Sequence, residues 1–193
     1  MLVDDVLKYN NRNTDNYWDV IKNDCSKFIT ESNGIPVYKT LPNNYSDLHR
    51  VKVRFKRKED AVSGVFDKAF INETYSLSNR SVYAYPHIPQ SNLRLESNLD
   101  LFYIFPIDGY KFLYSKEVVN ATNDYKSVID TVFNTFDNCN EAIDIVTDLI
   151  KYTYNAKNLY EGLTSSAEII FYNIPYYYAV RVNEEIDYNQ LIR

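Results

Sequence analysis

The chain has few of the residues from which phosphate-binding loops are built. Its 193 residues include only four glycines. These glycines, Gly34, Gly64, Gly109 and Gly162, stand far apart, so no glycine-rich loop can cradle a dinucleotide. Their scarcity therefore argues against a doubly wound parallel sheet with a phosphate loop.

Cysteine and histidine are scarce as well. Cys25 and Cys139 lack the clustered spacing of a zinc site and the density of a disulfide framework, so we expect buried free thiols. His49 and His87 have no ligand-spaced partner, and solvated or hydrogen-bonded roles are expected for both. A Cys-His nucleophile stays open as an alternative without local support. No metal site is predicted.

Long apolar runs are missing too, and Met1 to Leu7 carries two aspartates where a signal peptide would carry lysines. The content of 45% hydrophobic and 24% charged residues is typical of a globular protein. We therefore expect a single domain over residues 1–193, in a cytoplasm and without a membrane partner. The net charge of −5 argues against unspecific coating of nucleic acid but permits a local basic patch.

Tyrosine, in contrast, is abundant, with 19 residues, and asparagine pairs such as Asn10-Asn11 recur. A bias toward Tyr, Asn, Ile and Lys is what an AT-rich coding sequence produces, and phages and many small-genome bacteria fit that bias. The tyrosines alone are therefore not interpreted as a binding surface.

The hydrophobic periodicity predicts an α+β fold. Helices are expected over Asp15–Glu31, Ser63–Glu73, Tyr125–Asp137 and Asn140–Asn155. Strands are expected over Ile35–Leu41, Val51–Phe55 and Ser81–Tyr85, and Leu101–Phe105 with Tyr110–Tyr114 gives the clearest hairpin signal.

Two further segments suggest function. The basic run from His49 to Lys58 places like charges on one strand face, which predicts either phosphate contacts or a solvated edge strand protected by lysines. Glu168 opens an apolar run that Pro175 interrupts, so we expect this carboxylate at a sheet edge, as a candidate for chemistry or as a solvated strand end.

Several segments, taken in order, resemble a family of small phage-encoded proteins with an ADP-ribosyltransferase-like fold. The resemblance spans roughly Cys25 to Val182 and rests on the order and spacing of weak motifs. The matching segments are the helix around Asp24-Cys25, Val37-Tyr38-Lys39-Thr40, the basic run, the helix Phe66 to Phe70 with Arg80-Ser81 after it, Phe102 to Gly109, Ala167-Glu168-Ile169-Ile170 and Tyr176-Tyr177.

The resemblance implies a split β-sandwich with flanking helices and the use of NAD as a substrate. It assigns Glu168 as the acid that orients the ribose, Lys39 or Arg80 to the diphosphate, and Ser81 and Tyr83 to the nicotinamide site. An acid suits this chemistry because cleavage of the nicotinamide bond builds positive charge on the ribose.

Three segments depart from the family pattern. Lys39 and Thr40 stand where the family has Arg and Gly, and lysine lacks the bidentate fork that suits phosphate. Tyrosines in Ser81-Val82-Tyr83-Ala84-Tyr85 replace compact hydroxyl residues. Ser166, two residues before Glu168, is neither Gln nor Glu, so the signature of arginine-modifying members is missing.

The function implied is transfer of ADP-ribose from NAD to a host protein or nucleic acid in the host cytoplasm. The alternative is a catalytically inactive derivative that serves as a phage virion or assembly component, or as a host-interaction protein, with other virion proteins as partners. A third interpretation keeps the fold as a nucleic-acid-binding module that acts through Arg50 to Lys58.

Overall fold

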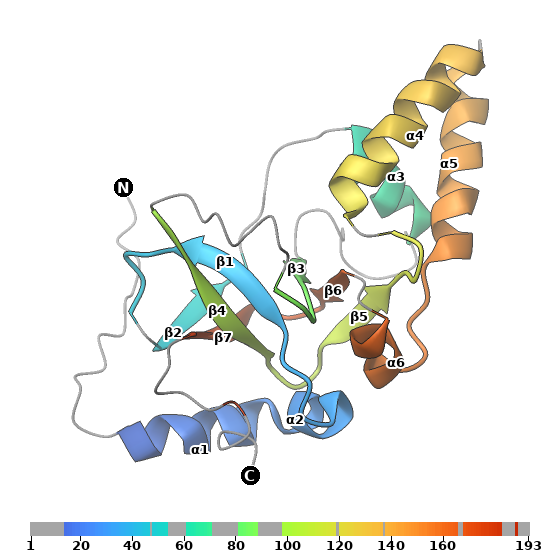
Figure 1. Cartoon of the computed structure of the whole chain (residues 1–193). Helices are drawn as coiled ribbons and strands as arrows, with labels where there is room; N and C mark the ends of the chain where they lie inside the picture. Colours follow the sequence, from blue (N-terminus) through green and yellow to red (C-terminus); the bar gives the residue numbers. More distant parts are fainter. Residues whose placement is uncertain are drawn as a thin grey trace.

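Two antiparallel sheets and six helices make up the described part of the chain (Figure 1). The computed structural model describes residues 14–46, 48–53, 61–70, 81–88, 98–118, 120–136, 138–165, 168–182 and 188. The helices are α1 (Thr14–Asp24), α2 (Ser26–Ser32), α3 (Ala61–Ala69), α4 (Ala121–Thr135), α5 (Cys139–Thr153) and α6 (Leu159–Thr164). The strands are β1 (Tyr38–Pro42), β2 (Leu48–Lys52), β3 (Val82–Ala84), β4 (Leu99–Pro106), β5 (Lys111–Tyr114), β6 (Ile169–Tyr172) and β7 (Tyr176–Arg181). The expected α+β class is confirmed.

The strands divide into a four-stranded sheet, in the order β1-β4-β7-β2, and a three-stranded sheet, in the order β3-β6-β5. A single backbone bridge joins the start of β1 to the end of β3. There the Tyr38 amide donates to the Tyr85 carbonyl at 2.7 Å, and the Tyr85 amide donates to the Tyr38 carbonyl at 2.9 Å. The two sheets therefore meet edge to edge at this bridge.

Of the connections that pass from one sheet to the other, the two shortest join β4 to β5 and β6 to β7. Each contains a residue with positive φ, Gly109 at 92° and Asn173 at 64°, as a sharp change of direction requires. The side-chain amide of Asn173 donates to the Gly109 carbonyl at 3.0 Å. This hydrogen bond therefore joins the two connections directly.

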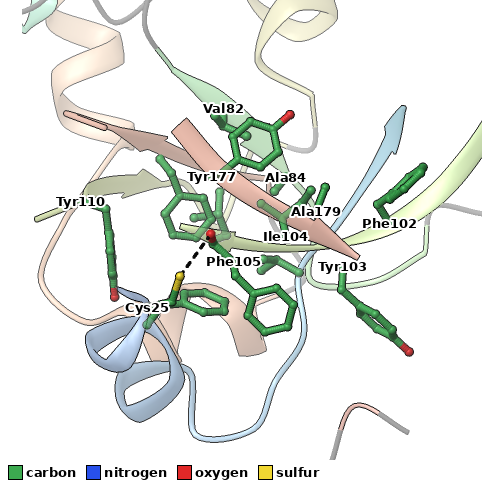
Figure 2. Close-up of a cluster of buried hydrophobic side chains, with 14 of the residues drawn as sticks. Cys25, Val82, Ala84, Phe102, Tyr103, Ile104, Phe105, Tyr110, Tyr177 and Ala179 are labelled. Carbon is green, nitrogen blue, oxygen red and sulfur yellow. Dashed lines mark hydrogen bonds between the residues drawn. The ribbon is translucent and has the colours of Figure 1, made fainter. Parts of the chain in front are cut away.

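Helix α2 covers the place where the sheets diverge. Its Phe28 is fully buried and makes edge-on contacts with Phe105 of β4 and Phe171 of β6, at ring-centroid distances of 6.2 and 5.8 Å. Figure 2 shows the same core from the side of Cys25, whose thiol donates to the Phe105 carbonyl at 3.5 Å. One aromatic side chain therefore connects both sheets to the helix below them, since edge-on pairs add to the burial energy.

The three-stranded sheet is covered on both faces. Ile169 and Phe171 of β6 face the core shared with the four-stranded sheet, whereas Ile170 and Tyr172 face helices α3, α4 and α5. Because side chains alternate along a strand, these two covers explain why β6 is apolar at every position.

Most of the expected elements are present with shifted ends. The helix expected over Asp15–Glu31 is divided at Cys25 into α1 and α2. The strand expected at Val51 begins at Leu48, and Arg54 and Phe55 lie outside the described residues. On α5 the buried stripe uses Ala142 with Val146 and Ile150, and Ile143 is only half-buried.

The hairpin expected from Leu101–Phe105 and Tyr110–Tyr114 is wrong. Both strands form, but β4 pairs with β1 and β7, and β5 pairs with β6. The turn between them is pulled toward α2, because the Asp108 carboxylate accepts from the Lys27 amide at 2.9 Å and from the Ser26 hydroxyl at 2.7 Å. Asp108 thus caps α2 instead of closing a hairpin.

Two helical glycines provide a matched test of this packing. A Cβ at Gly162 would lie 2.8 Å from the buried Tyr114 ring, whereas one at Gly64 on α3 would have no neighbour within 4 Å. We expect Gly162→Ala to lower the free energy of unfolding by about 1–3 kcal/mol through overpacking. Gly64→Ala should raise it by about 0.5–1 kcal/mol through helix propensity.

Urea unfolding midpoints of both variants and the wild type measure these two effects. Equal stabilities for the two variants would contradict the close approach of α6 to β5.

Candidate functional site

The candidate residues lie where β1 meets the three-stranded sheet. Lys39 follows the bridging Tyr38 on β1, and its Nζ donates to the backbone carbonyl of Tyr83 at 2.8 Å. Tyr83 is the middle residue of β3 and pairs with Ile170 of β6. Lys39 and Tyr83, which are 44 residues apart in the sequence, are therefore in direct contact.

Glu168 immediately precedes β6, the central strand of its sheet, and is only 4% exposed. The interpretation as a solvated strand end is therefore wrong. A carboxylate removed from water needs hydrogen-bond donors to remain charged. Tyr85 supplies one, since its hydroxyl donates to Glu168 Oε1 at 2.6 Å.

Tyr85 in turn contacts the segment before α4. The side-chain amide of Asn120 donates to the Tyr85 hydroxyl oxygen at 3.4 Å. Burial raises the pKa of Tyr85 well above its ordinary value, and the charge and hydrogen bond of Glu168 raise it further. The tyrosine therefore stays protonated and remains a donor at physiological pH.

The surroundings of this pair are aromatic. Tyr154, after α5, is 7% exposed, and its pKa is raised first by burial and then by the negative charge of Glu168. Tyr154 packs in the core beneath α3, α4 and α5, with Phe66 at a centroid distance of 5.4 Å. Glu168 thus stands at the border of an apolar core, where charge interactions are stronger than in water.

The remaining predicted site residues are placed less completely. Ser81 is half-buried directly before β3, one residue from Val82. Tyr83 is half-buried and packs against the core of α3, α4 and α5. Arg80, the alternative diphosphate anchor, lies outside the described residues. The structure thus places Lys39 in contact with Tyr83 of β3, and Glu168 at the start of β6, the strand that pairs with β3.

The basic run lies on the other sheet. Its described part includes β2, which stands at the end of the order β1-β4-β7-β2, with Arg50 and Lys52 exposed. The Arg50 guanidinium lies 3.6 Å from the centroid of the Tyr176 ring, and His49 stacks on Tyr45. Lys56, Arg57 and Lys58 lie outside the described residues.

Two surface cavities are found away from Glu168. One of about 300 Å³ is lined by Asn23, Asp24, Ile107, Asp108 and Tyr176. The other, of about 280 Å³, is lined by Glu31, Phe112, Lys157, Asn158 and Leu159. Neither is lined by Lys39, Ser81, Tyr83 or Glu168.

The Cys-His alternative gains no support among the described residues. Cys25 is completely buried, and burial together with the charges of Asp108 and Asp24 raises the pKa of its thiol. A thiol of this kind is a poor nucleophile. His49 is stacked on Tyr45, and His87 is exposed. The described residues also contain no group of three acidic, histidine or cysteine side chains that could hold a metal ion.

Sequence reasoning missed three residues of this site: Tyr85, Asn120 and Tyr154. Tyr85 had a usable signal, because strand alternation puts it on the same face as Tyr83. Asn120 and Tyr154 come from segments whose contact with Glu168's neighbourhood depends on how the helices pack, and local pattern carries no such information.

Comparisons of this chain with protein-family models, with curated proteins and with solved structures found no match. None of the described helices combines the length and apolar character needed to cross a bilayer.

Burial of Cys25 has a direct chemical consequence. In a Cys139→Ser variant, the remaining thiol should react with an aromatic disulfide reagent at pH 8 at least roughly 100-fold more slowly in the folded protein than in urea. The absorbance of the released thiolate measures both rates. Similar rates in the two conditions would contradict the enclosed position of Cys25.

Proposed function

We propose that this protein is a phage-encoded ADP-ribosyltransferase with a split β-sandwich fold, which transfers ADP-ribose from NAD to a host protein or nucleic acid. The observation that carries the proposal is the contact of Lys39 with Tyr83 of β3 together with the position of Glu168 at the start of β6, the strand that pairs with β3. These are the positions that the resemblance assigns to the diphosphate, the nicotinamide and the ribose.

In the proposed reaction, the bond between nicotinamide and the ribose carbon breaks, and nicotinamide leaves with the bonding electron pair. The ribose becomes positively charged as this bond lengthens. The carboxylate of Glu168 stabilises that charge and orients the ribose hydroxyls. A nucleophilic atom of the acceptor then bonds to the same ribose carbon and releases a proton.

Lys39 provides a single positive charge for the diphosphate. Its Nζ donates to the Tyr83 carbonyl, so this hydrogen bond holds the positive charge of Lys39 beside β3. An ammonium group keeps its charge when it donates a hydrogen bond. A lysine holds phosphate as a point charge and not through a bidentate fork, so weaker selection of the diphosphate orientation is expected. Ser81 and Tyr83 supply the wall for the nicotinamide ring, and Arg80 is a second candidate anchor.

One observation favours the alternative, a catalytically inactive derivative that acts as a virion or assembly component. Glu168 is 4% exposed, so NAD must displace neighbouring side chains before the ribose reaches the carboxylate. An inactive derivative needs no such movement. The two functions differ in whether Glu168 is dispensable.

Transfer from labelled NAD to host-cell lysate separates them. Glu168→Gln keeps the size of the side chain and removes its charge, and it should lower labelling about 100-fold or more. Glu141→Gln makes the same change at an exposed position on α5 and should leave labelling unchanged. Absence of labelling and of NAD binding in the folded wild type would overturn the transferase and favour the inactive derivative.

A further inference from the structure

The carboxylate of Glu168 is held by a side chain that the transferase resemblance does not assign. We propose that Tyr85 is a positioning residue, which fixes the orientation of the Glu168 carboxylate and its distance from Lys39. The hydroxyl of Tyr85 donates to Glu168 Oε1 at 2.6 Å, a short bond typical of a charged acceptor.

The backbone of Tyr85 is itself fixed on the side of Lys39. Both its amide and its carbonyl bond to Tyr38, the residue before Lys39, at 2.9 and 2.7 Å. Tyr85 therefore holds β1 through its main chain and Glu168 through its side chain.

Asn120 orients the hydroxyl of Tyr85. A phenol has one proton to donate and accepts through its oxygen. Because the Asn120 amide donates to that oxygen at 3.4 Å, the phenolic proton points to Glu168 and not to Asn120. Asn120 thus donates to Tyr85, and Tyr85 donates to the carboxylate of Glu168.

Other ionisable groups surround the hydrogen-bonded series Asn120–Tyr85–Glu168, and they affect any pH measurement. Tyr83 of β3 acts electrostatically on Tyr85, and Tyr154 after α5 feels the charges of Glu168, Tyr125 and Asp124. Burial raises the pKa values of Tyr85, Tyr125 and Tyr154, so these tyrosines do not titrate in the range of a carboxyl.

This inference rests on the proposed function only for the catalytic use of Glu168, and the hydrogen bond itself is tested without any substrate. We would label glutamate side chains with ¹³C at the carboxyl carbon, assign the Glu168 signal by its loss in Glu168→Gln, and titrate the ligand-free protein. Tyr85→Phe removes one donor to the charged form, so the titration midpoint of Glu168 should rise by about one pH unit.

Tyr110→Phe is the matched control. The Tyr110 hydroxyl also donates at 2.6 Å to a glutamate, Glu31. Tyr110 is buried, whereas Tyr85 is half-buried, and it packs against Phe28 in the other core. This variant should leave the Glu168 midpoint unchanged. An equal midpoint in Tyr85→Phe and the wild type would overturn the positioning role, as would an equal rise in Tyr110→Phe.

Transfer kinetics provide a second readout. If the wild type labels lysate, Tyr85→Phe should lower kcat about 10-fold, with the acid limb of the pH profile moved upward by the same amount as the midpoint. A raised midpoint without transfer by any variant would support the role of Tyr85 and refute the transferase. If the wild type is active and Tyr85→Phe has the same kcat and pH profile, the positioning role of Tyr85 is refuted and the transferase proposal is not.

Discussion

The backbone bridge between Tyr38 and Tyr85 is the contact on which the rest of the structure depends. It joins the four-stranded sheet to the three-stranded sheet at one point, and two short connections, through Gly109 and Asn173, also pass from one sheet to the other. Those crossings are tied by the Asn173 amide, and Phe28 fills the space where the sheets diverge. A sheet split in this way leaves strand ends facing each other, and the candidate residues occupy those ends.

Tyrosine has a consistent role in this protein, which the composition does not reveal. Four largely buried rings end in a hydroxyl that donates to a carboxylate: Tyr85 to Glu168, Tyr110 to Glu31, Tyr114 to Glu161 and Tyr178 to Asp24, at 2.6, 2.6, 3.0 and 2.7 Å. The ring of each tyrosine packs in the apolar core, and its hydroxyl finds a hydrogen-bond acceptor at the border of the core. Glu168 is the one buried acid among the four acceptors, and desolvation makes its hydrogen bond the most costly to lose.

The hairpin error shows where local pattern stops being informative. Runs of apolar and aromatic residues identified both β4 and β5, because such runs are typical of strands. A run of this kind does not identify the partner strand. The turn after Pro106 resembles a hairpin turn in composition, but Asp108 makes bonds to the start of α2 that a hairpin turn would not allow. The division of the expected first helix at Cys25 has the same origin, since Cys25 packs under β4 and bonds to Phe105.

The sequence by itself determined the α+β class, the approximate ends of most helices and strands, and the position of Glu168 at the start of a strand. These depend on periodicity, capping and turn residues, which act over a few neighbours. Only the tertiary structure decided that Glu168 is buried, that Tyr85 holds it and that Lys39 reaches Tyr83. Those contacts join residues 44 to 83 positions apart. They form because the two sheets and the six described helices bury their apolar faces together, a choice among many pairings that no short segment specifies.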